Sequence, residues 1–509
     1  MRLCGIETEY GIQVDGVDDM DVVVESMELI RCYSHEDFIA KWDYGRENPR
    51  LDMRGFEVDE LRNDKDETLH LQKDRDRKIP LAELKSDLLI SNGARLYNDH
   101  THPEYSTPEC YSLFDLLEQD RAGERILHNC ARRRTETRGK GVVRLYKNNT
   151  DFEGHSYGCH ENFLIGRQLP FQRVIEGLLP FLVTRQIFAG AGKVGIEQGG
   201  RADGGVFQVS QRADFFETIA SVDTMHRRPL VNTRDEPHAD PEQYRRLHLI
   251  VGDANMSEYI TALKVGSTAL FLDLLEADQL PPLQIEDPVR ALKAVSRDPA
   301  QRWEVTLTSG RRATAIEIQA AYLEKARALA SGRDRETDWV LAAWGDTLDK
   351  LASNREELIG VCDWVTKKWL LDSFAASEGL DWDDPSDRSW LQSQDLEYHN
   401  VDPDAGLFLL LEAQGDTQRL VDDEAVTRAV VQPPTETRAS FRGRVLQKFG
   451  EAVRSLNWDS VELESNGRMV VVDLKGCVDP QILSSYTHIL DRSSTVEELL
   501  AGLPTACVG

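Results

Sequence analysis

Several common sequence signatures are absent from this chain of 509 residues. It contains no Cys-x-x-Cys pair and no His-Glu-x-x-His spacing, which argues against a zinc site. The glycine-rich run at residues 190–195 lacks the full spacing and the terminal Ser or Thr of a Walker A motif. We interpret that run as a turn, with phosphate contact as the weaker alternative. No apolar run reaches membrane length, because Arg185 follows the most hydrophobic stretch, residues 177–183.

Basic residues are outnumbered by acidic ones, and the cysteines are not paired in spacing. The 88 acidic residues exceed the 60 basic ones, and the resulting net charge of −28 disfavours non-specific binding of nucleic acid. The eight cysteines show no paired spacing, which is typical of reduced thiols in the cytosol. The first residues lack the charged and then apolar pattern of a leader peptide. We therefore expect a cytoplasmic protein that binds neither nucleic acid nor a membrane.

The length and the local composition suggest two domains. The Pro433-Pro434 pair predicts a boundary, so we expect a large domain over residues 1–430 and a small mixed domain over residues 431–509. After the first predicted helix, an aromatic and then strongly charged segment predicts a loop insertion at about residues 36–86. Its charged half has the composition of a mobile loop, whereas its aromatic half could pack near a functional site.

Two glutamates near the start of the chain are the most informative residues. In the segment Gly5-Ile6-Glu7-Thr8-Glu9, a strand would place Glu7 and Glu9 on one face and Ile6 and Thr8 on the other. Adjacent carboxylates repel each other unless a proton or a cation lies between them, so the pair favours a divalent metal site. The alternative is the exposed face of an edge strand.

The same alternation recurs in later segments and predicts a sheet with one polar face. A helical layer would cover the other, apolar face. Oxygen ligands favour Mg²⁺ or Mn²⁺, and two imidazoles are compatible with such an ion. The side chains that share faces in these segments are Arg95 with Tyr97 and Asp99, His160 with Asn162, and Arg246 with His248.

Each of these residues also has an ordinary structural interpretation when taken alone. Asp99 could be a turn residue, and a single histidine is more often hydrogen-bonded within the fold than bound to a metal. Trp458 could simply pack in a core, and Arg234 could pair with the neighbouring Asp235. The functional interpretation therefore depends on the residues acting together.

Together the segments closely resemble the Pup ligase and depupylase family, whose catalytic domain is related to glutamine synthetase and glutamate–cysteine ligase. The resemblance implies an α+β fold, with a large glutamine-synthetase-like domain that has a curved, mainly antiparallel sheet backed by helices. A small C-terminal α/β domain would contribute to the nucleotide site. The matching stretches are residues 5–11, 92–110, 146–149, 156–162, 232–238, 244–258 and 437–443.

The resemblance also implies roles for individual residues. It makes Asp99 the catalytic aspartate, acting either as a nucleophile or as a general base, and it implies ATP, or ADP with phosphate, and Mg²⁺ as cofactors. One Mg²⁺ would be held by Glu7, Tyr97 and Glu104 and a second by Glu9, His160 and His248. The implied nucleotide contacts are Arg95, Thr107, Arg212, Arg234 and Trp458.

The family contains two activities, and the insertion separates them. Ligase members couple the C-terminal glutamate of the small protein Pup to lysines, whereas deamidase/depupylase members deamidate a C-terminal glutamine of Pup and cleave the isopeptide bond. Trp42-Asp43-Tyr44 and Arg54-Gly55-Phe56 resemble the deamidase/depupylase insertion. We therefore predict an ATP- and Mg²⁺-dependent, monomeric hydrolase whose partners are Pup and pupylated proteins. The alternatives are the ligase, a nucleotide-binding pseudoenzyme, and an enzyme acting on a related modifier.

Overall fold

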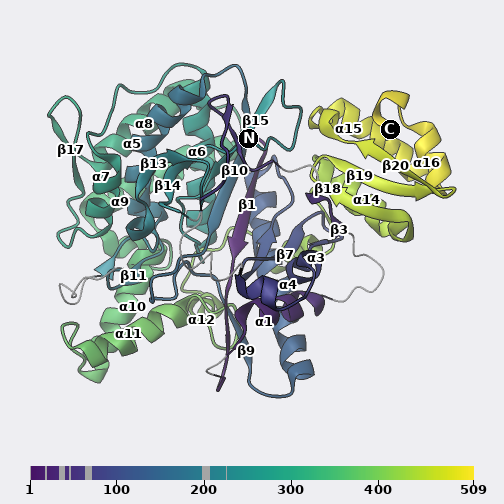
Figure 1. Cartoon of the computed structure of the whole chain (residues 1–509). Coiled ribbons are helices and arrows are strands. Elements are labelled where there is room, and N and C mark those ends of the chain that lie inside the picture. The colour runs from purple at the N-terminus through teal and green to yellow at the C-terminus, as the bar shows by residue number, and fades with distance from the viewer. Residues whose placement is uncertain are drawn as a thin grey trace.

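The computed structural model describes residues 2–17, 20–33, 41–44, 48–62, 72–197, 207–224 and 226–509. Parts of the predicted insertion, residues 36–40, 45–47 and 63–71, lie outside these ranges. Figure 1 shows a large body with a sheet at its centre, a helical layer on one side, and a smaller C-terminal body on the other. In the part described, no helix combines the length and the apolar character needed to cross a membrane.

A six-stranded sheet forms the centre of the large body. Its strand order is β15-β10-β1-β8-β7-β6, and every neighbouring pair is antiparallel. Burial alternates along β1 and β10, as the sequence predicts, whereas nearly every residue of β7 and β8 is buried. The sheet agrees with the predicted α+β class. The strands are β1 (Cys4–Glu9), β6 (Leu88–Leu89), β7 (Arg95–Asp99), β8 (His102–Ser106), β10 (Cys159–Gly166) and β15 (Tyr244–Leu249).

The two faces of this sheet differ in polarity. In β1 the side chains of Cys4, Ile6 and Thr8 are buried, whereas Glu7 and Glu9 are partly exposed on the opposite face. Three helices pack against the apolar face, and their contact with it sets the direction in which the glutamates point. These helices are α1 (Val22–Arg31), α4 (Leu113–Arg138) and α6 (Glu258–Glu276).

Local capping sets where these helices begin and end. The hydroxyl of Ser112 accepts a hydrogen bond from the backbone of Asp115 at the start of α4. Gly139 ends α4 with a φ of 73°, a left-handed conformation that glycine adopts without steric cost. Ser257 caps α6 in the same way as Ser112 caps α4, because its hydroxyl accepts from the backbone of Ile260.

Further helices form a layer beside the sheet and share the main hydrophobic core with it (Figure 1). The glycine-rich run, which we interpreted as a turn, instead contains a short strand, and Gly192 and Gly195 on either side of it have positive φ. The helices that share this core are α5 (Phe171–Ala189), α7 (Pro288–Ser296), α8 (Ala315–Ala330), α9 (Arg335–Ser353), α10 (Asp363–Glu378) and α13 (Asp423–Ala429). Three others pack in smaller clusters: α3 (Leu81–Lys85), α11 (Pro385–Tyr398) and α12 (Leu407–Gln414). The short paired strands are β2 (Gly11–Val14) with β9 (Val143–Tyr146), β4 (Leu51–Asp52) with β5 (Phe56–Glu57), β11 (Lys193–Val194) with β12 (Phe207–Gln208), β13 (Thr218–Ser221) with β14 (Pro229–Asn232), and β16 (Glu304–Thr306) with β17 (Arg312–Thr314).

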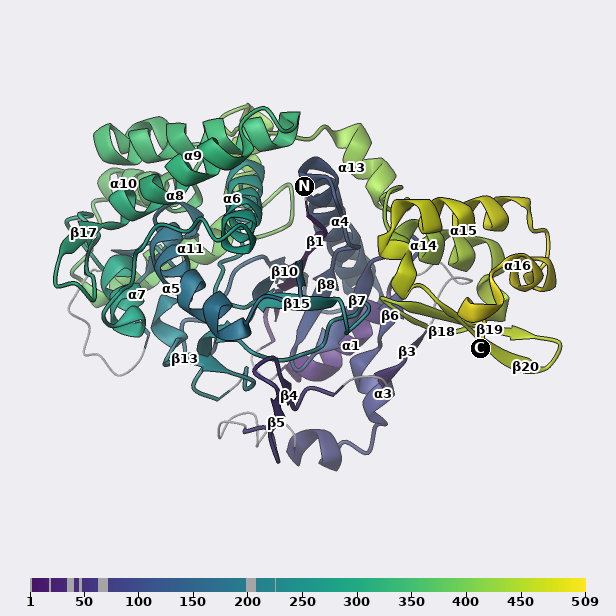
Figure 2. The same ribbon diagram turned by 90° about the horizontal axis from the view of Figure 1, so that it is seen from above.

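The C-terminal body has its own sheet and its own hydrophobic core. The sheet order is β20-β19-β18-β3, and its edge strand β3 (Lys41–Trp42) comes from the insertion and runs parallel to β18. Trp42 is buried in the core of this body. Figure 2 shows the body lying beside the β6 edge of the central sheet. The remaining elements are β18 (Val453–Asn457), β19 (Ser460–Ser465), β20 (Arg468–Asp473), α14 (Arg438–Phe449), α15 (Pro480–Arg492) and α16 (Val496–Gly502).

Candidate active site

Acidic and histidine side chains meet on the polar face of the central sheet. They form two groups of three residues. Within each group, the atoms that could bind a metal all lie within 4.8 Å of one another. The antiparallel pairing produces both groups, because Glu7 lies opposite His160 while Glu9 lies opposite Glu104. Each group therefore combines residues from strands that are far apart in the sequence.

The first group consists of Glu7, His160 and His248. One carboxylate oxygen of Glu7, Oε2, lies 3.2 Å from Nδ1 of His160 and 3.2 Å from Nε2 of His248. The two imidazole rings are 4.9 Å apart and nearly perpendicular. The imidazoles hold the pKa of Glu7 well below its usual range although burial alone would raise it.

In this group, the ring nitrogens of His248 are the strongest structural indication of a metal site. Both ring nitrogens are buried without a hydrogen-bond partner among the described residues, because the contact of Nε2 with Glu7 lacks hydrogen-bond geometry. Burial lowers the pKa of His248 to about 4, more than the neighbouring Glu7 raises it. The imidazole is therefore neutral at physiological pH, the form that binds a metal.

The second group consists of Glu9, Asp99 and Glu104. Glu104 is buried, and its pKa is raised well above the usual range by that burial and by the nearby Asp99, Glu7 and Glu9. Carboxylates this close repel one another unless a cation lies between them. Their oxygen atoms are the ligands that Mg²⁺ prefers, so both groups fit the expected cofactor.

Glu7 lies between the two predicted ligand sets, because it contacts both histidines and is also close enough to Glu104 and Tyr97 to raise the pKa of each. From the sequence we grouped Glu7 with Tyr97 and Glu104, and Glu9 with the histidines. In the structure Glu7 contacts the histidines and Glu9 lies near Glu104, because strand register rather than order along the chain sets these neighbours. Tyr97 lies opposite Glu104 on β7, so it stays beside the second group.

Asp99 lies at the end of β7, where its side chain is 24% exposed. Its Oδ2 lies 3.2 Å from Nδ1 of His100, a residue with a positive φ of 56°. Burial alone would raise the pKa of Asp99, but His100, Lys85 and Arg95 together hold it below the usual range. Asp99 is therefore an ionised carboxylate that solvent and a substrate can reach.

Arg95 is enclosed more completely than the sequence suggests. Its guanidinium carbon lies 3.9 Å from the ring centroids of both Trp42 and Tyr97. Two of its nitrogens also donate to the carboxylate of Asp87, over 3.0 and 2.6 Å. Sequence reasoning missed Asp87, which has no motif around it. The aromatic half of the insertion thus packs at the site, as one of our two alternatives predicted, because Trp42 and Tyr44 both contact Arg95.

Arg212 and Arg234 form no ion pair with a carboxylate among the residues that the structure describes. Arg212 is buried, donates to Ser156 over 3.2 Å and to the carbonyl of Ile250, and its pKa is lowered to about 10 by burial and by Arg228. Burial also lowers the pKa of Arg234. Two cations that lack carboxylate partners favour the binding of an anion such as phosphate.

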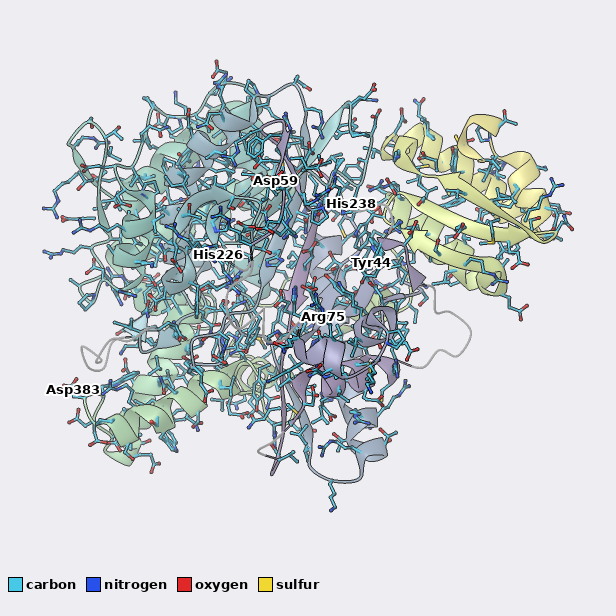
Figure 3. The ribbon with its side chains drawn as sticks, viewed as in Figure 1. Tyr44, Asp59, Arg75, His226, His238 and Asp383 are labelled. Carbon is cyan, nitrogen blue, oxygen red and sulfur yellow. The ribbon has the colours of Figure 1, made fainter. Side chains whose placement is uncertain are left out.

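A pocket opens between the start of β1 and the C-terminal body. Thr107 and Trp458, which lie far apart in the sequence, both line it, together with Glu7 of the first acidic group. The pocket also includes His238 and Arg438, which we had not assigned. His238 and Tyr44 are labelled in Figure 3, in the region between the central sheet and the C-terminal body. Of the five predicted nucleotide contacts, Thr107 and Trp458 therefore line one cavity beside Glu7. The lining of this pocket does not include Arg95, Arg212 or Arg234.

Comparison with known proteins gives the family. The Pup-ligase protein family matches residues 2–462. The chain belongs to this family. Among its relatives, a depupylase of Acidothermus cellulolyticus is 44% identical over 99% of this chain and 99% of its own length. A Pup deamidase/depupylase of Mycolicibacterium smegmatis is 40% identical over 92% of this chain and 93% of its own.

Ligase members of the family are also similar. A Pup–protein ligase of Acidimicrobium ferrooxidans is 45% identical over 75% of this chain and 84% of its own length. The ligase PafA, solved in complex with Pup, has a TM-score of 0.77 at 32% identity and covers 99% of this chain and 95% of its own. PafA solved in complex with ADP has a TM-score of 0.71 at 35% identity, over 87% of this chain and 94% of its own.

Proposed function

We propose that this chain is a hydrolase that deamidates the C-terminal glutamine of Pup to glutamate and cleaves the isopeptide bond between Pup and substrate lysines. One observation carries the proposal: the match to a depupylase extends over 99% of both chains. The ligase relative is equally identical but aligns over only 75% of this chain. The extent of the alignment, not the percentage identity, therefore favours the hydrolase.

The cofactors of this reaction are ATP, or ADP with phosphate, and Mg²⁺. We assign Mg²⁺ to Glu7, Glu9, Tyr97, Glu104, His160 and His248, and the nucleotide to Arg95, Thr107, Arg212, Arg234 and Trp458. When bound, Mg²⁺ would neutralise the crowded carboxylates and polarise an oxygen atom coordinated to it. In this proposal residues 1–430 form the catalytic domain, and residues 431–509 close the nucleotide pocket.

Asp99 supplies the reactive carboxylate. Hydrolysis requires an attack on the γ-carbonyl carbon, cleavage of the C–N bond and a proton for the departing amine. The exposed, ionised Asp99 can attack that carbon itself to form an anhydride, or it can take a proton from the attacking water. Both routes yield a C-terminal glutamate on Pup, and the leaving group is ammonia from the glutamine of Pup or the lysine side-chain amine of a conjugated protein.

We place the reaction in the cytoplasm and assign it to a monomer. All eight cysteines are free thiols, which fits a reducing compartment. The partners in this proposal are Pup and proteins that carry it.

Mass spectrometry of Pup tests the proposed reaction directly. Incubation of the chain with Pup ending in glutamine, ATP and Mg²⁺ is expected to add about one mass unit to Pup, because an amide becomes an acid. A pupylated protein should in parallel release Pup and regain its unmodified lysine side chain. Conjugates formed from Pup ending in glutamate and a lysine-bearing protein would instead identify a ligase. No change in either substrate would identify a nucleotide-binding pseudoenzyme.

Crowding of the second acidic group predicts an effect on stability when the metal is removed. In the presence of EDTA, Glu104→Gln is expected to raise the melting temperature by about 3 °C, because it removes one of three mutually repelling carboxylates. With Mg²⁺ the gain should disappear or reverse. Thermal unfolding of both proteins, with and without Mg²⁺, measures this difference.

The matched control for that experiment is Glu464→Gln, which removes an exposed carboxylate that pairs with Arg454. It should change the melting temperature equally with and without Mg²⁺. An equal change for Glu104→Gln under both conditions would contradict a metal site at this position.

A further inference from the structure

A largely buried carboxylate joins the central sheet to the C-terminal body. Glu109, in the segment between β8 and α4, accepts hydrogen bonds from two arginines at the start of α14. Arg438 donates over 3.1 Å, and the two terminal nitrogens of Arg442 donate over 2.7 and 2.5 Å. The exposed fractions of the three side chains are 11%, 5% and 1%. We call these three residues the Glu109 clamp.

The clamp carries one negative and two positive charges. Burial alone would raise the pKa of Glu109, but Arg442 and Arg438 lower it to about 2. Glu109 is therefore ionised at physiological pH. It neutralises one arginine and leaves a net positive charge at the wall of the nucleotide pocket, which both Glu109 and Arg438 line.

Each arginine also donates a hydrogen bond to the backbone of another residue that lines the pocket. Arg442 donates to the backbone carbonyl of Trp458 over 2.8 Å, and its guanidinium lies 5.2 Å from the centre of the indole ring. Arg438 donates to the carbonyl of His238 over 2.8 Å. His238 has a positive φ of 48°, which is uncommon for a residue other than glycine. The clamp therefore fixes one wall that comes from the C-terminal body and another that comes from a strained loop of the sheet body.

The fit around the clamp leaves little room for α14 to shift. Arg442 also donates to the carbonyl of Gly93 over 3.2 Å. A side chain at Gly93 would place its Cβ 2.9 Å from that of Ala439, and one at Gly443 would lie 2.4 Å from the carbonyl oxygen of Ser91. Helix α14 is thus seated directly on the turn that leads into β7, and a change in the clamp is transmitted to both bodies.

We propose that Glu109 is a positioning residue for the nucleotide, acting through Arg442 on Trp458 and through Arg438 on His238. This inference rests on the proposed function, because it assumes that the pocket lined by Thr107 and Trp458 binds the nucleotide. Glu109 takes no part in the chemical steps of the reaction. Its effect is on nucleotide affinity and not on the rate of the chemical step.

An electrostatic role and a positioning role of Glu109 predict opposite results for Glu109→Gln, so the inference can be tested. The substitution adds net positive charge to the pocket, so a purely electrostatic role would tighten the binding of an anionic nucleotide. A positioning role predicts the reverse, because the arginines lose their anchor. We expect the KM for ATP and the Kd for ADP to rise about tenfold, with kcat at saturating ATP within about twofold of wild type.

Arg442→Lys provides a second variant in case Glu109→Gln destabilises the fold. Lysine keeps the positive charge, but it lacks the planar guanidinium that donates to Glu109 and to the Trp458 carbonyl at the same time. It should therefore fold and still raise the KM for ATP. Arg454→Met is the matched control, because it removes an exposed arginine of the same body that pairs with Glu464. It should leave the KM unchanged.

A double-mutant cycle with Trp458→Ala separates positioning from a general structural role. Because Trp458 is one of the two routes through which Glu109 acts, Glu109→Gln should cost clearly less than tenfold, about threefold, in ADP affinity once the indole is absent. A full tenfold loss in both backgrounds, unchanged affinity in Glu109→Gln, or a fall in kcat at an unchanged KM would each overturn the inference. If wild type shows no ADP binding by calorimetry, the proposed nucleotide site fails. If wild type binds ADP and the variants bind it with the same affinity, only the proposed role of the Glu109 clamp is refuted.

Discussion

Asp99→Asn is expected to lower kcat for the deamidation of Pup by about 10³-fold. The amide is uncharged, so it can neither attack the γ-carbonyl carbon nor accept a proton from water. Binding of ADP should change little, because Asp99 does not line the nucleotide pocket. Thermal stability with Mg²⁺ present should also change little, because Asp99 is partly exposed and packs no core. The measurement is the rate of the one-unit mass gain of Pup at saturating substrate.

The control for this variant is Asp346→Asn on α9, which removes an exposed partner of Lys350. It changes the net charge equally and should retain full activity. If Asp99→Asn keeps more than about a tenth of wild-type kcat, Asp99 is not the reactive carboxylate.

Labelled water distinguishes the two roles of Asp99. In a single turnover in H₂¹⁸O, attack by Asp99 produces an anhydride whose hydrolysis can leave ¹⁸O in the aspartate itself. Activation of water by Asp99 leaves ¹⁸O only in the new carboxylate of Pup. Mass spectrometry of the peptide that contains Asp99 measures the difference.

Glu7→Gln is expected to lower activity by about 10²-fold at a Mg²⁺ concentration that saturates wild type. Glu7 is the carboxylate that lies 3.2 Å from both imidazoles, and an amide oxygen is a weaker ligand for a divalent cation. Raising the Mg²⁺ concentration should recover part of the activity. Titration of activity with Mg²⁺ and direct binding of Mn²⁺ measure the loss of affinity.

Glu464→Gln again serves as the control, since its carboxylate lies in the C-terminal body and pairs with Arg454. Its Mg²⁺ dependence should match that of wild type. An unchanged Mg²⁺ dependence in Glu7→Gln, with activity reduced to the same extent at every concentration, would argue against Glu7 as a metal ligand.

Much of the site could be predicted because strand periodicity is local. The spacing of two residues that separates Glu7 from Glu9, and Tyr97 from Asp99, places each pair on one face in any strand. Apolar residues at the alternate positions then decide which face is buried. These inferences needed no knowledge of the partner strands, and the structure confirms the strands in all four segments.

The partners of those side chains could not be predicted in the same way. Glu7 contacts His160 because β1 and β10 pair in a register that no local pattern encodes. Arg95 is neutralised by Asp87 and covered by Trp42 only after the insertion joins the sheet of the C-terminal body. Glu109 has no distinctive motif around it, so the sequence does not predict its pairing with Arg442, which forms where the two bodies meet.

The sequence by itself determined which chemical groups the site has and which face of each strand presents them, because alternation along a strand follows from backbone geometry. Tertiary structure alone decided which carboxylate meets which imidazole, which arginines keep their charge for an anion, and how the C-terminal body is fixed to the pocket. Those contacts depend on strand register and on the packing of distant segments, and both are set by the whole chain as it buries its apolar surface.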